Sequence, residues 1–251
     1  MELIFAANGA AALVIIVTLL AWERWRPFAA APKGTSRVFK NFALAAMNAG
    51  LSRILIVPLT AAAALAAPAW RPGFADGGWF ILVDLILLDL WIYWWHRGNH
   101  ELPFLWRFHE VHHLDRFLDV SSAVRFHFGE VILSALVRAV LIMVMDVPLV
   151  SVLIFDSIVL AAAGFHHANI RLPEKVERRL RYVIVTPSHH WVHHHRVRED
   201  TDSNYGTVLS LWDRLFGSLS PTPRTPSMDI GTEGREEKPL FGLIVRPAKS
   251  P

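Results

Sequence analysis

The chain has 251 residues and no cysteine, so it can bury a sizeable core, and disulfide-stapled miniproteins and thiolate chemistry are excluded. Hydrophobic residues make up 53% and charged residues 19% of the sequence, against about 45–50% and roughly 25% in soluble domains. The formal net charge is only +3, and the basic residues are spread over loops and a tail, so we expect no nucleic-acid partner. This composition predicts a membrane protein.

Five apolar runs approach the length of about 20 helical residues that crosses a bilayer core. They lie, in chain order, at residues 3–22, 50–69, 79–95, 130–146 and 148–165. The first run follows Glu2 and lacks the basic region of a signal peptide, so we expect it to remain as a span. The pattern predicts an all-α fold, a multi-pass membrane helical bundle of four or five spans.

The basic residues predict the orientation of this bundle. The loop at 23–40 carries five lysines or arginines, whereas the loop at 68–78 carries only Arg71. Because cytoplasmic loops are richer in basic residues, we expect 23–40 in the cytoplasm and the N-terminus outside. Alternation of the spans then places 96–129 and everything after 166 in a cytoplasmic helical cap. We therefore expect a multi-pass integral membrane protein, which would lie in the inner membrane if the source is bacterial.

Four charged residues lie more than four positions from either end of an apolar run. They are Asp84, Asp89, Arg138 and Asp156. An ionisable side chain is costly in lipid and normally turns into the bundle. Pairing among these four residues and a functional role both remain open from the sequence.

All 13 histidines lie between residues 96 and 195, although an even scatter would place only about five in such a window. The repeated spacings are HRGNH at 96–100, HEVHH at 109–113 and HWVHH at 190–194. Residues three and four apart share a helix face, so these motifs present two, three and three imidazoles to one side. Eight imidazoles exceed the four to six positions around one ion, so two bound metal ions are predicted. Of the five remaining histidines, four are individually expected to be structural: His127, His166, His189 and His195.

Metal-bound histidines usually donate their other ring N–H to a carboxylate or carbonyl. Asp89 and Tyr93 are spaced to share a helix face with His96 and His100. Glu101 and Glu110 stand next to predicted ligands. The candidates for orienting the ligands are therefore Asp89, Tyr93, Glu101 and Glu110.

The ligand type leaves the metal open, because imidazoles bind iron, zinc, copper and nickel. The expected membrane location favours a lipid substrate, since a lipid reaches such a site by lateral movement and a water-soluble substrate needs no bilayer. Two redox metals with open positions would suit O₂ activation and attack on a C–H bond.

The ordered motifs resemble the fatty acid hydroxylase/sterol desaturase superfamily of membrane di-iron oxygenases. The similar segments are DLWIYWWHRGNHE, WRFHEVHH, HAN, TPSHHWVHHH, NYG and LWDRLFG, and the resemblance covers residues 84–217. The HRxxHE start and the short gap between His100 and His109 are most similar to the alkylglycerol monooxygenase branch. The resemblance implies hydroxylation, desaturation or ether cleavage of a lipid or sterol-like substrate with O₂.

The resemblance also implies the ligands and partners. The eight-histidine pattern of the family carries over onto His96, His100, His109, His112, His113, His190, His193 and His194, and His167 in HAN matches a ninth ligand. Asn204 in NYG is a looser match. Two iron ions are implied, with zinc possible in recombinant material. No cytochrome b5 or reductase module is recognised, so electrons are expected from a separate electron-transfer protein or a diffusible reductant.

Three regions are expected on this basis. Residues 1–78 hold two spans and the basic loop, 79–217 form the catalytic domain, and 218–251 form a Pro-rich tail that is loosely ordered apart from the apolar segment 241–245.

Two other functions fit parts of the pattern. HEVHH also satisfies HExxH, with His109 and His113 as zinc ligands and Glu110 as general base, which is typical of a metalloprotease. An intramembrane zinc protease would, however, leave the five other repeated histidines unused. A non-catalytic metal transporter or sensor is the second alternative, although so many ligands would trap an ion rather than pass it on.

Overall fold

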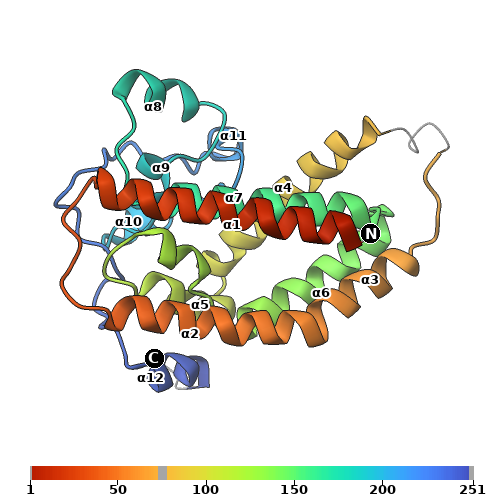
Figure 1. The fold of residues 1–251 in the computed structure, drawn as a ribbon, viewed down its shortest axis with the longest axis horizontal. Helices are drawn as coiled ribbons and strands as arrows, with labels where there is room; N and C mark the ends of the chain where they lie inside the picture. Colours follow the sequence, from red (N-terminus) through yellow and green to blue (C-terminus); the bar gives the residue numbers. More distant parts are fainter. Residues whose placement is uncertain (1, 73–77, 249–251) are drawn as a thin grey trace.

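The computed structural model describes residues 2–72 and 78–248, and over these residues it is built from helices with three isolated β-bridges and no sheet. The all-α fold class is confirmed. The long helices are α1 (Glu2–Trp25), α2 (Ser36–Leu51), α3 (Val57–Leu65), α4 (Phe80–Glu101), α6 (Phe128–Met145) and α7 (Leu149–His167). Helices α1, α2 and α7 run roughly along the long axis of the molecule, and α4 crosses it obliquely (Figure 1). The short helices α8 (Glu174–Leu180), α9 (Pro187–His193), α10 (Arg198–Thr201) and α11 (Leu211–Leu215) gather at one end (Figure 1).

Three helices in the described part of the chain are long and apolar enough to cross a membrane. They are Ser36–Leu65, Phe128–Met145 and Leu149–His167. Helices α1 and α4 coincide with the predicted runs 3–22 and 79–95, but α4 also carries Asp84, Asp89 and Arg97. The structure therefore provides three candidate spans, whereas the sequence predicts four or five.

The second candidate span begins earlier in the structure than the apolar run 50–69 predicts. The helix starts at Ser36 and continues through a π-helical turn, Ser52–Ile56, into α3. Residues 36–40 were expected in a loop because they are polar and basic. In the structure their polarity serves tertiary contacts, since Arg37 donates to Asp115 and Asp119 and Asn41 donates to Asp115. Helix α2 thus holds the segment that follows α5 (Pro103–His113).

The predicted tight turn between the last two apolar runs is confirmed. Asp146 ends α6 in the left-handed conformation, with a φ of 52°, and Pro148 caps α7. The two helices run antiparallel, so the start of α6 and the end of α7 lie on the same side of the molecule (Figure 1). Their shared core contains Ile142 and Phe155, packed against Leu88 of α4.

Helix α1 covers α7 at close range. A Cβ built on Gly164 of α7 would lie 2.8 Å from Ile16 Cδ1 and 3.3 Å from Leu19 Cδ1. Glycine at this position therefore allows the two helices to approach.

The described part of the tail, residues 218–248, contacts the helices within the apolar segment 241–245, which was excepted from the loosely ordered tail, and also outside that segment. Leu243 of α12 (Leu240–Ile244) is fully buried against Leu44 and Val111. Glu237 forms ion pairs with Lys40 and Arg125. Proline and charge suggested disorder, but these residues find partners on the helices, which sequence spacing does not reveal.

Candidate metal centre

The histidine motifs lie at helix ends that converge. HRGNH occupies the last turns of α4, HEVHH ends α5, and HWVHH forms the end of α9 and its C-cap, His194. Pro103 and Pro187 occupy the first turns of α5 and α9, where a missing backbone N–H costs nothing. Leu102, with extended backbone, lets α5 turn away from the end of α4. All nine predicted ligands come together, in two groups.

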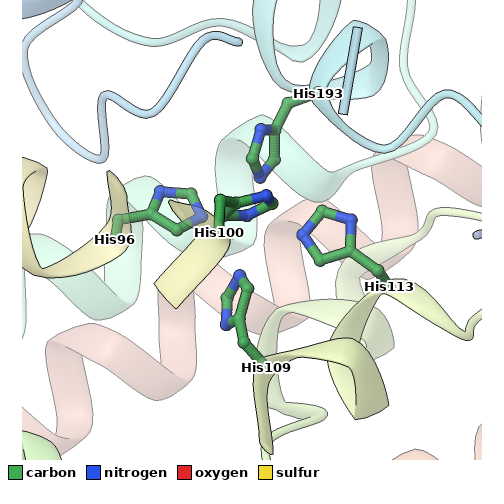
Figure 2. Close-up of side chains that lie close together, drawn as sticks. All are labelled: His96, His100, His109, His113 and His193. Carbon is green, nitrogen blue, oxygen red and sulfur yellow. The ribbon is translucent and has the colours of Figure 1, made fainter. Parts of the chain in front are cut away.

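Five histidines form the first group, shown in Figure 2. It contains His96, His100, His109, His113 and His193. One ring nitrogen from each lies within 4.8 Å of the others, and every ring is buried. Neighbouring rings approach closely, with centroids 4.6 Å apart for His96 and His193 and 4.8 Å for His100 and His113.

Four histidines form the second group. It contains His112, His167, His190 and His194, all buried. Their Nε2 atoms follow one another at 3.1 Å, from His112 to His167, from His167 to His190 and from His190 to His194. Nitrogens about 2.0–2.1 Å from a common ion have separations of this size.

The protonation of the rings in the second group indicates that their facing Nε2 atoms bind a cation rather than hydrogen-bond to each other. His112 Nδ1 lies 3.1 Å from the Arg125 carbonyl and His167 Nδ1 lies 2.8 Å from the Ala163 carbonyl. A carbonyl only accepts, so both Nδ1 atoms carry the proton. The two facing Nε2 atoms then present lone pairs to each other at 3.1 Å. A metal ion between them removes that repulsion, so these residues fit a bound metal.

The first group shows the same outward donation. Nδ1 of His96 donates to the Tyr205 carbonyl at 2.8 Å, and Nδ1 of His193 donates to the Ser203 carbonyl at 2.6 Å. His109 Nδ1 lies 2.9 Å from Glu130 Oε1. Among the described residues, buried Nε2 atoms without a hydrogen-bond partner belong to His100, His109, His113 and His193. Such orphaned inward nitrogens are what metal ligands require.

Burial keeps these rings in the form that binds metal. Loss of solvation lowers the pKa of His112, His113 and His193 well below 6.5. Neighbouring imidazoles add to the effect, since His167 lowers the pKa of His112 and His194 lowers that of His113. Neutral imidazoles offer the lone pair that coordination needs.

The four candidates for orienting ligands have other partners. Asp89 accepts from the Val208 and Leu209 N–H groups and from Trp212 Nε1, and Tyr93 bonds Ser218. Glu101 pairs with Arg97, and Glu110 pairs with Arg246 and Arg235. Among the described residues, no hydrogen bond joins Asp89, Tyr93, Glu101 or Glu110 to a histidine of either group.

Other residues hold the ligands from outside, and sequence reasoning missed them. Glu130 of α6 accepts from His109 and Asn99, and Asp202 lies 3.4 Å from His100 Nδ1. The signal for Glu130 was an acid at the start of an apolar run, directly after a histidine-containing segment. The carbonyls of Ser203 and Tyr205 left no signal, because any residue type supplies a carbonyl.

The four histidines outside the repeated ligand set also have assigned contacts. His127 caps α6 by accepting from the Gly129 N–H and bonds the Ile244 carbonyl. His189 pairs with Asp213 and His195 with Asp200. His166 is buried with its ring centroid 4.0 Å from that of His190.

Asp213 anchors the loop that carries two of the ligand-holding carbonyls. Its carboxylate is fully buried and accepts from the N–H groups of Tyr205 and Gly206, from Ser218 and from His189. Asn204, the looser family match, donates from Nδ2 to the His189 carbonyl and accepts from the Ser220 N–H. Both residues therefore support the loop between α10 and α11.

We expect Asp213→Ala to lower the thermal unfolding midpoint by roughly 10 °C, because several buried donors lose their acceptor at about 1–3 kcal/mol each. Differential scanning fluorimetry in detergent measures the midpoint. Asp229→Ala is the control, since the Asp229 side chain is 68% exposed and lies 3.5 Å from Arg196. Equal midpoints for the two variants would contradict the anchoring role.

A cavity of about 440 Å³ leads to both histidine groups. We call it the apolar cavity. Its wall includes His96 and His109 of the first group and His112, His167 and His190 of the second. The rest of the wall comes mainly from apolar side chains of α2, α4, α6 and α7, such as Ala45, Ile92, Ala135, Val159 and Leu160. The cavity can therefore hold an aliphatic chain with one part against the histidines.

A buried pair of histidine groups at the end of an apolar cavity defines a candidate metal centre in a helical membrane protein. The fatty acid hydroxylase family model matches residues 81–218, which is more than half of the chain. The chain belongs to the fatty acid hydroxylase family, and the resemblance seen in the motifs is confirmed.

Named relatives modify lipids and sterols. The chain is 29% identical over 167 residues to ornithine lipid hydroxylase of Rhizobium tropici, covering 66% of this chain and 50% of the relative. It is 32% identical over 146 residues to alkylglycerol monooxygenase of Danio rerio, covering 58% and 32%. It is 28% identical over 152 residues to a cholesterol 25-hydroxylase-like protein of Danio rerio, covering 59% and 58%. The matches thus span between about a third and three fifths of these relatives. No solved structure matches the chain.

Proposed function

We propose that the protein is a membrane-bound di-iron oxygenase that uses O₂ to hydroxylate a lipid or sterol-like substrate, with desaturation and ether cleavage as related outcomes. The observation that carries this proposal is the meeting of two buried imidazole groups at one end of the apolar cavity. The lipid-modifying relatives support the same substrate class.

The nine histidines would hold two iron ions, five in the first group and four in the second. Bound iron would supply the activation of O₂ and the oxidising power for C–H attack. The residues of the chain position the reaction. The Ser203 and Tyr205 carbonyls and Glu130 fix the ligand rings, and the apolar wall excludes water and aligns an aliphatic chain.

The electrons would come from a separate electron-transfer protein or a diffusible reductant. We further propose that four or five helices span the membrane, that residues 79–217 form the catalytic domain, and that the short helices form a cytoplasmic cap. Helices α1, α4 and α7 end, and α2 and α6 begin, at the end of the molecule near this cap (Figure 1). This common end supports one membrane face for the site.

The test uses protein purified from membranes and loaded with iron. We expect two iron ions per chain by elemental analysis and, with isotopically labelled O₂ and a chemical reductant, labelled oxygen in extracted lipids by mass spectrometry. Iron at this stoichiometry without labelled or desaturated lipid would contradict the oxygenase.

The same preparation separates the oxygenase from the zinc protease. Glu110 is already paired with Arg246 at 2.7 Å and with Arg235 at 3.6 Å, so the general base of that alternative is occupied. We expect Glu110→Gln to retain lipid oxidation. One zinc ion per chain together with peptide hydrolysis that Glu110→Gln abolishes would instead establish the protease. The transporter alternative gains no support from ligand groups that enclose an ion on several sides.

The orientation can be tested cleanly because the chain has no cysteine. Glu236 and Ala66 are exposed residues, Glu236 in the C-terminal segment near the cap and Ala66 at the end of α3. We expect a thiol reagent that does not cross membranes to label Ala66→Cys in intact cells and Glu236→Cys only after the cells are opened. The reversed labelling pattern would place the site on the outer face.

A further inference from the structure

The apolar cavity carries an ion pair far from the histidines. Apart from Glu130 at the histidine end, the acidic and basic residues in its described wall are Arg138 of α6 and Asp156 of α7. Arg138 Nη1 and Asp156 Oδ1 lie 2.5 Å apart. The pairing that the sequence left open is thus present. Its place in the wall of the cavity raises the question of what it binds.

Helix geometry places the pair far along the bundle from the histidine groups. Arg138 follows Glu130 by eight residues and Asp156 precedes His167 by eleven residues, which at 1.5 Å per residue corresponds to about 12 Å and about 17 Å along the helices. Both helices are candidate membrane spans. Charged side chains at such depth are costly and typically mark substrate pathways.

The pair differs from a second ion pair of the same helical bundle. Arg71 and Asp84 have side chains only 9% and 1% exposed, and they bond additionally to the Met145 carbonyl and Ser151. The Asp156 side chain is 45% exposed, so the cavity reaches the outer surface of the bundle beside it. Each of the two arginines has one buried nitrogen without a hydrogen-bond partner among the described residues, Arg138 Nε and Arg71 Nη1, but only Arg138 and Asp156 line the apolar cavity. The pair at Arg138 therefore retains binding capacity.

We propose that Arg138 and Asp156 bind the uncharged polar group of a single-chain amphiphile, with a hydroxyl as its simplest form. A hydroxyl can accept from the Arg138 guanidinium and donate to Asp156, whereas a carboxylate meets the negative charge of Asp156 and an ammonium meets the positive charge of Arg138. The aliphatic chain would extend through the apolar cavity to the histidine groups. This inference rests on the proposed function and names the substrate class of the same site.

The test measures binding rather than turnover, so it is independent of the proposed oxygenation. Radiolabelled hexadecanol, hexadecane and hexadecanoate are titrated, without reductant or O₂, into the protein in phosphatidylcholine nanodiscs. Hydrogen bonds to charged groups predict that hexadecanol binds about tenfold more tightly than hexadecane. The double substitution Arg138→Met/Asp156→Leu should bring this ratio close to one, and Arg138→Lys, which keeps the charge but loses the guanidinium group, should reduce it severalfold.

The control is Arg71→Met/Asp84→Leu, which removes an ion pair that does not line the cavity and should leave the ratio unchanged. Thermal midpoints confirm that each variant is folded. If Arg138→Met/Asp156→Leu does not fold, Arg138→Lys alone tests the inference. An unchanged ratio in the Arg138 variants, or tighter binding of hexadecanoate than of hexadecanol, would overturn the inference. If the unmodified, iron-loaded protein prefers hexadecanol over hexadecane but oxidises no lipid, that result would count against the proposed function alone.

Discussion

Replacing His194 by alanine is expected to reduce the iron content from two ions per chain to one and lipid oxidation to background. His194 belongs to the group of four, so the change leaves three imidazoles there. His193→Ala leaves four imidazoles in the group of five. We therefore expect His193→Ala to retain more iron at its site than His194→Ala, while both lose turnover.

Iron content and labelled-oxygen incorporation, measured on the same preparations, test this asymmetry. His127→Asn is the matched control, because His127 lies outside both groups and asparagine also caps helices well. It should retain two ions. If His194→Ala also retains two ions, His194 is not a ligand.

The helices and the ligands could be predicted from the sequence because both depend on local spacing. Apolar runs predicted both ends of α6 and of α7 to within two residues. The motif spacings, together with the family resemblance, identified nine histidines, and all nine enter the two groups. How the nine divide could not be predicted, since His112 and His113 are neighbours in sequence yet lie in different groups.

The residues that orient the ligands could not be predicted, because adjacency in sequence is not contact in space. Successive helical residues point about 100° apart, so Glu110 leaves the face that His109 and His113 share. It pairs with Arg246 from the far end of the chain. Asp89 does lie on the ligand face of α4, but the loop before α11 covers that face and takes its hydrogen bonds. Tertiary contacts of this kind leave no periodic signal.

Glu130 gives the sharpest test of that distinction. Its Oε1 accepts from His109 Nδ1 at 2.9 Å and from Asn99 Nδ2 at 3.2 Å, and the residue is buried. Loss of such a ligand-orienting partner typically costs about 10- to 100-fold in metal affinity or activity. We expect Glu130→Ala to weaken iron binding within this range, and Glu130→Gln, which keeps an acceptor oxygen, to weaken it less.

Glu101→Gln is the matched comparison. Glu101 follows His100 directly in the sequence, but its side chain is 51% exposed and pairs with Arg97. Titration of each iron-loaded variant with a chelator measures affinity, and the thermal midpoint of the metal-free protein separates orientation from folding. If direct contact with a ligand histidine controls iron binding, Glu130→Ala lowers the iron affinity with little change in that midpoint. Glu101→Gln then has the iron affinity of the unmodified chain. Equal losses in both variants would mean that charge near the centre, rather than the His109 hydrogen bond, controls iron binding.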